Sequence, residues 1–270
     1  MNPVVITGAS GAMGSAAVKM MAEKGYPVIM ACRNVEKGEA CKAKILVDLP
    51  DADLRVLPLD LSRLASVKAF AQNLSEEGVT LAGLFNNAGI MNRKYSVTED
   101  GLENTLQVNF ISPAMLSRWL LPLMELEGNI VNMVSLTCRI AKIDEHLLEL
   151  KEKDFGQLNT YGKSKLALLL FTIALARHTD IHVNMADPGV VNSNMIHMSR
   201  WFDPLADALF RPFCKSPEQG ARPAVNALRS SETQHLFNGS KCREVPKKFL
   251  SNPLIDWTWK TVDELFCRFD

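Results

Sequence analysis

The sequence predicts an α/β fold of the Rossmann type: a single doubly wound parallel sheet with helices on both faces and a C-terminal substrate lid. Short β-branched runs alternate with longer helical patterns over residues 1–190, and a glycine-rich turn follows the first of these runs. In addition, 47% of the 270 residues are hydrophobic and 22% are charged. This balance is typical of a globular protein with a substantial core.

The predicted strands are nearly continuous apolar runs, as expected where helices cover both faces of a sheet. They span residues 4–7, 27–32, 54–58, 79–86, 129–134 and 181–186. Helices are predicted between them near residues 12–24, 35–48, 63–76, 100–125 and 159–178. After Pro188 the pattern is less regular, although Ser216-Pro217-Glu218-Gln219 is typical of a capped helix start. A last helix is predicted over residues 256–266.

The domain organisation follows from what the chain lacks, since we find no internal repeat, low-complexity tract or linker. Residues 1–270 are therefore interpreted as one Rossmann domain. Within it, residues 192–213 are rich in Met and aromatic side chains and are interpreted as a substrate lid. Residues 214–270 are interpreted as a C-terminal elaboration of the same domain.

Charge and cysteine usage exclude several classes of protein. Thirty basic and thirty acidic residues give no net charge, so neither nucleic acid nor an anionic membrane is an expected partner. The six cysteines form no Cys-x-x-Cys pair and no Cys/His cluster, which indicates reduced thiols and predicts no metal site. We recognise no signal peptide, and the apolar stretch 166–176 is about half the length needed to cross a bilayer. The expected compartment is the cytoplasm.

The glycine-rich turn at residues 7–14 reads Thr-Gly-Ala-Ser-Gly-Ala-Met-Gly and leads from the first strand into the first helix. Glycines at such a turn let backbone N–H groups approach a pyrophosphate at the positive end of the helix. The turn is therefore predicted to bind a dinucleotide, with a plain strand-to-helix turn as the alternative. The predicted contacts are Gly8, Ser10, Gly11, Ala12, Met13 and Gly14.

The end of the second strand predicts which dinucleotide binds. An Asp or Glu at this place binds the ribose hydroxyls of NAD, whereas an Arg pairs with the 2′-phosphate of NADP. The chain has Arg33 and Asn34 here and no acid. We therefore expect NADP or NADPH at these residues, with NAD less favoured. The alternative is that Arg33 is a solvated surface residue.

Several motifs together resemble the short-chain dehydrogenase/reductase family. They are Asn86-Asn87-Ala88-Gly89 after the fourth strand, Asn109 in the next helix, Ser135 after the fifth strand, Tyr161-Gly162-Lys163-Ser164-Lys165, and Pro188-Gly189 after the sixth strand. Within the family, Asp60-Leu61-Ser62 and residues 98–103 and 216–221 are most similar to the retinol-dehydrogenase-like and protochlorophyllide-reductase-like branch. The glycine spacing of the turn instead resembles the sugar-nucleotide branch, so an epimerase or reductase of that kind stays an alternative.

The resemblance implies hydride transfer between a nicotinamide cofactor and a carbonyl or alcohol, with Asn109, Ser135, Tyr161 and Lys165 as the catalytic residues. Tyr161 and Lys165 are four residues apart and therefore share a helix face, so the ammonium can lower the pKa of the phenol. Ser135 would hold the substrate oxygen, and Asn109 would complete a relay to Lys165. The further cofactor-binding residues implied are Asp60, Leu61, Asn87, Ala88, Gly89, Tyr161, Lys165, Pro188, Gly189, Val191 and Ser193.

The predicted lid bears on the substrate and on oligomeric state. Met195, Met198, Trp201 and Phe202 are adaptable apolar side chains and favour a small apolar substrate. Their alternative role is a contact in a homodimer or homotetramer. A second functional alternative is an NADP-binding redox sensor or regulatory module without turnover. The complete set of catalytic residues favours the enzyme, because a protein that only binds has no need of a phenol and an ammonium side by side.

Overall fold

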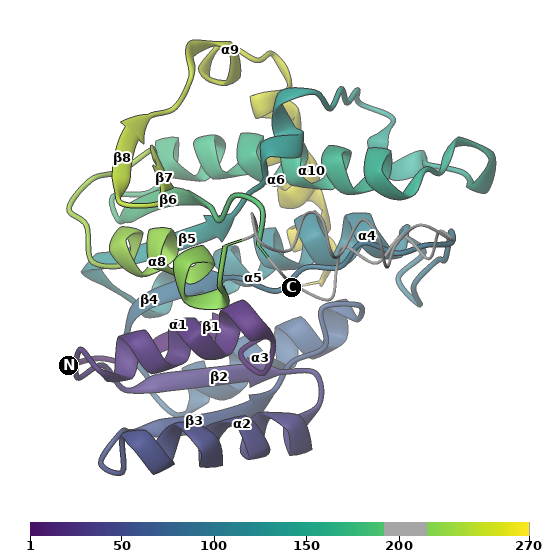
Figure 1. The fold of residues 1–270 in the computed structure, drawn as a ribbon. Helices are drawn as coiled ribbons and strands as arrows, with labels where there is room; N and C mark the ends of the chain where they lie inside the picture. The colour runs from purple at the N-terminus through teal and green to yellow at the C-terminus, as the bar shows by residue number, and fades with distance from the viewer. Residues whose placement is uncertain (192–214, 270) are drawn as a thin grey trace, which may run out of the picture.

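The computed structural model describes residues 1–191 and 215–269, which form one eight-stranded sheet flanked by helices (Figure 1). The strand order is β3-β2-β1-β4-β5-β6-β7-β8. The predicted lid, residues 192–213, lies outside the described residues.

All six predicted strands are confirmed, and each pairs in parallel with its neighbours. They are β1 Val4–Thr7, β2 Val28–Cys32, β3 Leu54–Pro58, β4 Leu81–Asn86, β5 Met124–Met133 and β6 His182–Asp187. The chain winds outward from β1 to β3 and then returns to place β4 on the other side of β1. The order therefore reverses between β1 and β4, the point at which ligands bind in open α/β sheets.

Alternate residues of the central strands face the two helical layers, as the period of a strand requires. Val4 and Ile6 of β1 pack in one apolar cluster, while Val5 packs in the other. The first cluster includes residues of α1 Ala12–Ala22, α2 Val35–Asp48 and α8 Pro217–Ala227. The second includes residues of α3 Leu64–Glu76, α5 Ser112–Leu120 and α6 Gln157–Arg177. The doubly wound fold class is thereby confirmed.

The single helix predicted over residues 100–125 is wrong. The segment contains α4 Asn104–Leu106, a π-helical turn Gln107–Ile111 and α5, and β5 already begins at Met124. Glu103 starts the helical part, since its side chain accepts a hydrogen bond from Leu106 N–H at 2.9 Å. Pro113 has no N–H and its ring crowds the carbonyl four residues earlier, which accounts for the wider π turn. Pro122, in the short 3₁₀ turn after α5, ends this helix.

The C-terminal part contains two strands that the sequence analysis does not predict. The strand β7 His235–Asn238 lies parallel to β6, and β8 Lys241–Glu244 pairs antiparallel to β7. The predicted start of α8 is confirmed, because the Ser216 side chain and Gln219 form a capping box. After α9 Lys247–Leu250, the predicted last helix is confirmed as the longer α10 Leu254–Phe269.

Helix α10 returns to the core and packs against α5 and α6. Its Trp259 stacks on His178 with ring centroids 4.0 Å apart, and Val262 is fully buried. Among the described helices, none combines the length and the apolar character needed to span a bilayer.

Candidate active site

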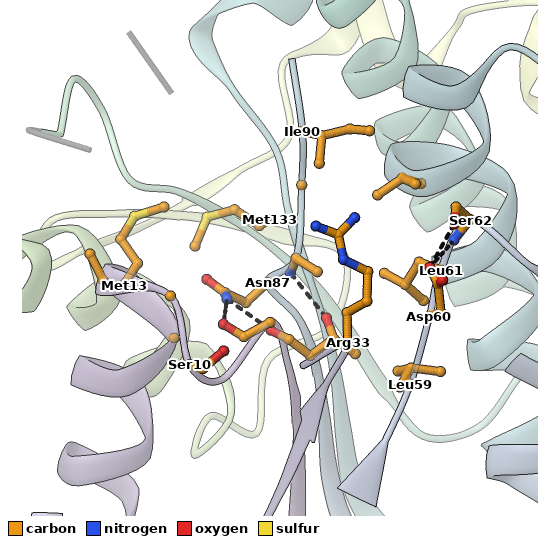
Figure 2. Close-up of a pocket in the computed structure, with 18 of the residues that line it drawn as sticks. Ser10, Met13, Arg33, Leu59, Asp60, Leu61, Ser62, Asn87, Ile90 and Met133 are labelled. Carbon is orange, nitrogen blue, oxygen red and sulfur yellow. Dashed lines mark hydrogen bonds between the residues drawn. The ribbon is translucent and has the colours of Figure 1, made fainter. Parts of the chain in front are cut away.

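A cavity of about 510 Å³ opens at the carboxyl ends of the central strands, where the strand order reverses (Figure 2). Its lining includes most of the predicted cofactor-binding residues. These are Gly8, Ser10, Gly11, Ala12, Met13, Gly14, Arg33, Asn34, Asp60, Leu61, Asn87, Ala88, Gly89, Tyr161, Lys165 and Pro188. Two of the other predicted residues, Gly189 and Val191, follow Pro188 but do not line this cavity. Ser193 and the lid residues Met195, Met198, Trp201 and Phe202 lie outside the described residues.

The cavity has further lining residues that the sequence analysis missed. They are Thr7, Lys37, Leu59, Ser62, Ile90, Val108, Met133 and Val134. Most of them are immediate neighbours of predicted residues at strand ends. Their position was the available signal, because Leu59, Ile90, Val108, Met133 and Val134 are apolar and Thr7 and Ser62 offer only a hydroxyl. Lys37 is different, since it is a cation one helical turn after Asn34 and could have been found by charge.

The glycine-rich turn has two positions that only glycine fits. Gly8 has a φ of +63°, and an added Cβ would lie 3.0 Å from Ala88 Cα. At Gly14 an added Cβ would lie 2.2 Å from the carbonyl oxygen of Gly8. Gly11 has an ordinary φ of −79° and would meet only that same oxygen, at 3.2 Å. The turn therefore depends on Gly8 and Gly14, and it brings the N-terminus of α1 to the cavity wall.

Asn87 joins the end of β4 to this turn. Its Nδ2 donates to the carbonyl oxygen of Thr7 at 2.8 Å, and Ala88 N–H donates to Thr7 Oγ1 at 3.0 Å. Asn87 Oδ1 is buried and has no hydrogen-bond partner in the described part of the chain. A buried acceptor without a donor is costly, and a cofactor hydroxyl is a suitable donor. This orphaned oxygen and the glycine cradle both fit a bound dinucleotide.

The opposite end of the cavity carries positive charge. Figure 2 shows the Arg33 guanidinium directed into the cavity from the end of β2. Asn34 Oδ1 accepts from Lys37 N–H at 2.7 Å and caps α2, which places Lys37 at the same end. Among the described lining residues Asp60 is the one acid, and its Oδ1 accepts from both Ser62 N–H and Ser62 Oγ (Figure 2).

Tyr161 and Lys165 enter the cavity from the first turns of α6. Lys165 is only 2% exposed, and its Nζ donates to the carbonyl oxygen of Met133 at 2.9 Å. Burial lowers the pKa of Lys165 to about 8. Burial also raises the pKa of Tyr161 to about 12, opposed by hydrogen bonding with the Ser135 side chain. The phenol is therefore protonated at neutral pH in the protein alone.

Ser135 and Asn109, the other two predicted catalytic residues, are not among the described residues that line the large cavity. Ser135 begins a 3₁₀ turn, and its Oγ accepts from Thr137 N–H at 3.3 Å. Asn109 is fully buried in the π-helical turn, where Nδ2 donates to Ile90 O at 2.8 Å and Oδ1 accepts from Ile90 N–H at 2.8 Å. A Cβ built at Gly89 would lie 3.3 Å from Asn109 Oδ1 and 3.4 Å from Lys165 Nζ. The two side chains therefore flank Gly89.

A further contact connects Asn109 to α6. Its Nδ2 also donates to Ser164 Oγ at 3.0 Å, and Ser164 Oγ donates to the carbonyl oxygen of Tyr161 at 2.7 Å. Ser164 is fully buried. The sequence analysis includes Ser164 in a motif but assigns it no role. The Ser164 hydroxyl therefore connects the π-helical turn to the turn of α6 that carries Tyr161.

The loop after β6 forms the remaining wall. Gly189 has a φ of +72°, and its N–H donates to Asp187 Oδ1 at 2.9 Å. Lys215 Nζ donates to the carbonyl oxygen of Pro188 at 3.0 Å, and Lys215 forms a parallel bridge with Val191. Pro188 is thereby fixed at the edge of the cavity.

Comparison with known proteins identifies the family. Residues 2–201 match the family model for short chain dehydrogenase. The chain is 34% identical to retinol dehydrogenase 12 of Homo sapiens, over 97% of this chain and 85% of that protein. It is 32% identical to polyprenol dehydrogenase of Mus musculus, over 85% of this chain and 72% of that protein.

Solved structures agree with this result. An uncharacterized protein from Mycobacterium Paratuberculosis has a TM-score of 0.79 at 26% identity, covering 98% of this chain and 93% of its own. A Brucella melitensis protein described as a short-chain dehydrogenase/reductase has a TM-score of 0.66 at 19% identity, over 88% of this chain and 95% of its own, and supports the fold alone. The chain belongs to the short-chain dehydrogenase/reductase family, oxidoreductases that transfer hydride with a nicotinamide cofactor, and within it to the retinol-dehydrogenase-like branch.

Proposed function

We propose that this protein is an NADP-dependent alcohol dehydrogenase or carbonyl reductase that acts on an apolar substrate. The observation that carries the proposal is the pair Tyr161 and Lys165 at the wall of the large cavity, with the Ser135 side chain lowering the pKa of the phenol against the effect of burial. When bound, the cofactor would supply or accept the hydride. Its phosphates would lie at the glycine-rich turn and the N-terminus of α1.

The chain's own residues then manage the proton. In reduction, Tyr161 donates its phenolic proton to the carbonyl oxygen, and Ser135 orients the same oxygen through its hydroxyl. The raised pKa of Tyr161 keeps this proton in place at neutral pH. In oxidation, Tyr161 accepts the hydroxyl proton, which requires its pKa to fall. The Lys165 ammonium favours that change because positive charge stabilises a phenolate.

The preference for NADP over NAD rests on Arg33 and Lys37 at one end of the cavity. A charge-assisted contact to the 2′-phosphate contributes about 1.5 to 3 kcal/mol, or roughly ten- to a hundredfold in affinity. Fluorescence titration with NADPH and NADH measures this preference directly, and we expect Arg33→Asp to reverse it. Equal dissociation constants for the two cofactors in the wild type would contradict the proposal.

The apolar substrate and the compartment are also part of this proposal. Two relatives are named for retinol and polyprenol, both apolar alcohols, which supports a substrate of that chemistry. Cys32, Cys41, Cys138, Cys242 and Cys267 have free thiols, in keeping with a reducing compartment such as the cytoplasm.

The decisive test is turnover. We expect the protein to oxidise NADPH in the presence of apolar aldehydes or ketones, and Tyr161→Phe to lose roughly 10²- to 10⁴-fold in kcat with NADPH affinity retained. Tyr26→Phe is the matched control, because Tyr26 packs against the first apolar cluster, the one that includes residues of α1, α2 and α8. If Tyr161→Phe keeps more than about a tenth of the activity, another group carries the proton. Tight NADPH binding without turnover on any carbonyl or alcohol would support the regulatory module instead.

A further inference from the structure

Two cysteines from different elements, Cys32 and Cys41, meet beneath the glycine-rich turn. Cys32 is the last residue of β2, immediately before Arg33, and Cys41 lies in the middle of α2. Cys32 belongs to the first apolar cluster, and Cys41 packs against it. The Cys41 thiol donates to the carbonyl oxygen of Ala9 at 3.9 Å, and both cysteines are free thiols. Neither takes part in the chemistry proposed above.

Gly38 allows α2 to approach the Cys32 side chain. A Cβ built at Gly38 would lie 3.1 Å from Cys32 Sγ and 3.3 Å from Cys32 Cβ, so the helix backbone lies directly against this side chain. Gly38 and Cys41 are three residues apart and therefore share a face of the helix. Hydrogen bonding with Ser10 and with the Ala9 backbone also lowers the pKa of Cys32 against the effect of burial. The two sulfurs therefore approach the same residue, Ala9, from β2 and from α2.

The two thiols differ in access to solvent. Cys32 is 0% exposed, whereas Cys41 is half-buried, so a dissolved oxidant reaches Cys41 first. Burial raises the pKa of both thiols, so both are protonated at neutral pH. This environment suits a slow, reversible oxidation of the pair and does not suit nucleophilic catalysis by either thiol.

We propose that Cys32 and Cys41 form a reversible disulfide, and that this bond weakens binding of the nicotinamide cofactor. The oxidant is a small disulfide such as oxidised glutathione. The Cys41 thiolate attacks one of its sulfurs and releases the first glutathione, and the Cys32 thiolate then attacks the Cys41 sulfur and releases the second. Two protein thiols are thereby oxidised to one disulfide. The glutathione disulfide is reduced to two thiols, which take up the two protons that the cysteines lose.

The new bond acts on the cavity through the turn and through α2. A disulfide holds its sulfurs about 2 Å apart, so Cys41 no longer donates to Ala9. Gly38 already lies against Cys32, so α2 has little room to move toward β2 and the turn has to shift. Ser10 in this turn lines the cavity (Figure 2), as does Lys37, the neighbour of Gly38. The inference rests on the proposed function only in placing the cofactor phosphates at this turn.

Peptide mapping tests the bond. The full-length protein is incubated with oxidised glutathione, denatured and digested with trypsin without reduction. Cleavage after Arg33, Lys37 and Lys42 leaves the two cysteines in separate peptides, residues 25–33 and 38–42. We expect mass spectrometry to find these peptides linked in the wild type and in the control Cys242→Ser, which removes an exposed thiol, but not in Cys41→Ser. Absence of the linked peptides, or glutathione retained on Cys41, would overturn the inference.

Fluorescence titration tests the effect on the cavity. The ligand is whichever of NADPH and NADH binds the reduced protein more tightly. We expect the dissociation constant to be at least about tenfold higher for the oxidised protein and to return to its first value after treatment with dithiothreitol. Cys41→Ser should bind equally well before and after oxidation. Unchanged affinity of the oxidised wild type, or an equal loss in Cys41→Ser, would overturn the inference.

Thermodynamic linkage gives an independent check. If the disulfide weakens cofactor binding, bound cofactor must favour the two thiols by the same factor. At a fixed ratio of reduced to oxidised glutathione, saturating cofactor should therefore lower the fraction of linked peptides, and an equal fraction would count against the inference. These measurements need binding and no turnover. A preference for NADH, or a lack of turnover, would contradict the proposed function without altering the outcomes expected here.

Discussion

The three glycines of the phosphate-binding turn differ in how tightly the backbone constrains them. At Gly14 a methyl group would lie 2.2 Å from the Gly8 carbonyl oxygen, so the turn has to shift to accept it. We predict that Gly14→Ala destabilises the protein by about 1 to 3 kcal/mol and abolishes measurable NADPH binding. Urea unfolding and fluorescence titration check the two parts of this prediction.

Gly11→Ala is the matched control for that variant, because Gly11 has a negative φ and an added Cβ would approach only one oxygen, at 3.2 Å. We expect its stability and NADPH affinity to stay close to those of the wild type. A loss in Gly11→Ala as large as that in Gly14→Ala would mean that the cofactor approaches the turn differently.

The lowered pKa of Lys165 predicts how the stability of the protein changes with pH. Burial lowers its pKa from 10.5 to about 8, so between these pH values the unfolded chain holds a proton that the folded protein has released. The contribution of Lys165 to stability therefore rises with pH through this window, and below pH 8 burial of the charge costs about 3 kcal/mol. We predict that Lys165→Met is more stable than the wild type at pH 7, and that the difference shrinks toward pH 10.

Chemical denaturation of both proteins between pH 7 and 10 measures this difference. The raised pKa of the buried Cys138 thiol acts in the opposite direction above about pH 9. Because both proteins keep Cys138, its contribution largely cancels in the comparison. A difference that stays constant across this range would show that Lys165 has an ordinary pKa in the folded protein.

At the scale of elements, a buried hydroxyl links the π-helical turn to α6 by hydrogen bonds. Ser164 Oγ accepts from Asn109 Nδ2 and donates to the Tyr161 carbonyl oxygen. We predict that Ser164→Ala costs about 1 to 3 kcal/mol of stability, because it leaves a buried Asn109 N–H without its acceptor. It should also lower kcat and shift its pH profile, since the turn that carries Tyr161 loses its link to Asn109.

Ser164→Thr is the conservative variant and should restore the pH profile, because it keeps the hydroxyl. Exposed Ser75 of α3 provides a control, and Ser75→Ala is expected to change stability by less than about 0.5 kcal/mol. Steady-state kinetics across pH and urea unfolding are the measurements. Full activity and an unshifted profile in Ser164→Ala would show that Asn109 is held adequately by Ile90.

At the scale of the whole molecule, the C-terminal helix completes the core. The guanidinium of Arg118 in α5 lies 4.5 Å from the Trp259 ring and 4.6 Å from the Phe266 ring, and Arg118 pairs with Asp263 at 2.9 Å. Trp259 also stacks on His178 of the segment after α6. We predict that Trp259→Ala costs about 3 kcal/mol, the lower end for such a truncation because the indole is only partly buried. Urea unfolding measures this cost.

An unchanged midpoint of urea unfolding in Trp259→Ala would show that α10 contributes little to the stability of the folded protein. Tryptophan fluorescence and far-UV circular dichroism should give coincident unfolding curves if α10 unfolds together with the domain. Separate curves would identify α10 as an independently unfolding element.

The sequence by itself determined the parallel sheet and the position of the cavity. Apolar runs bounded by turns predict strands because parallel strands are buried on both faces, and the residues after them must meet at one edge of the sheet. The same reasoning predicts Gly14 and Arg33 at one cavity, and the resemblance to the short-chain dehydrogenase/reductase family adds Asn87 and Tyr161; all four line it. Asn34 was also predicted there, although its side chain proves to cap α2.

Only the tertiary structure decided the features that depend on contacts distant in sequence. The four-residue strands β7 and β8 carry no strong apolar pattern, so their pairing with β6 and with each other defines them. The π-helical turn combines a local cause, Pro113, with the Asn109 contacts to Ile90. A smaller cavity lies between residues 137–141 and residues 158–162, where the small residues Ala141 and Gly162 face each other. The space left between packed side chains cannot be read from the sequence of either segment alone.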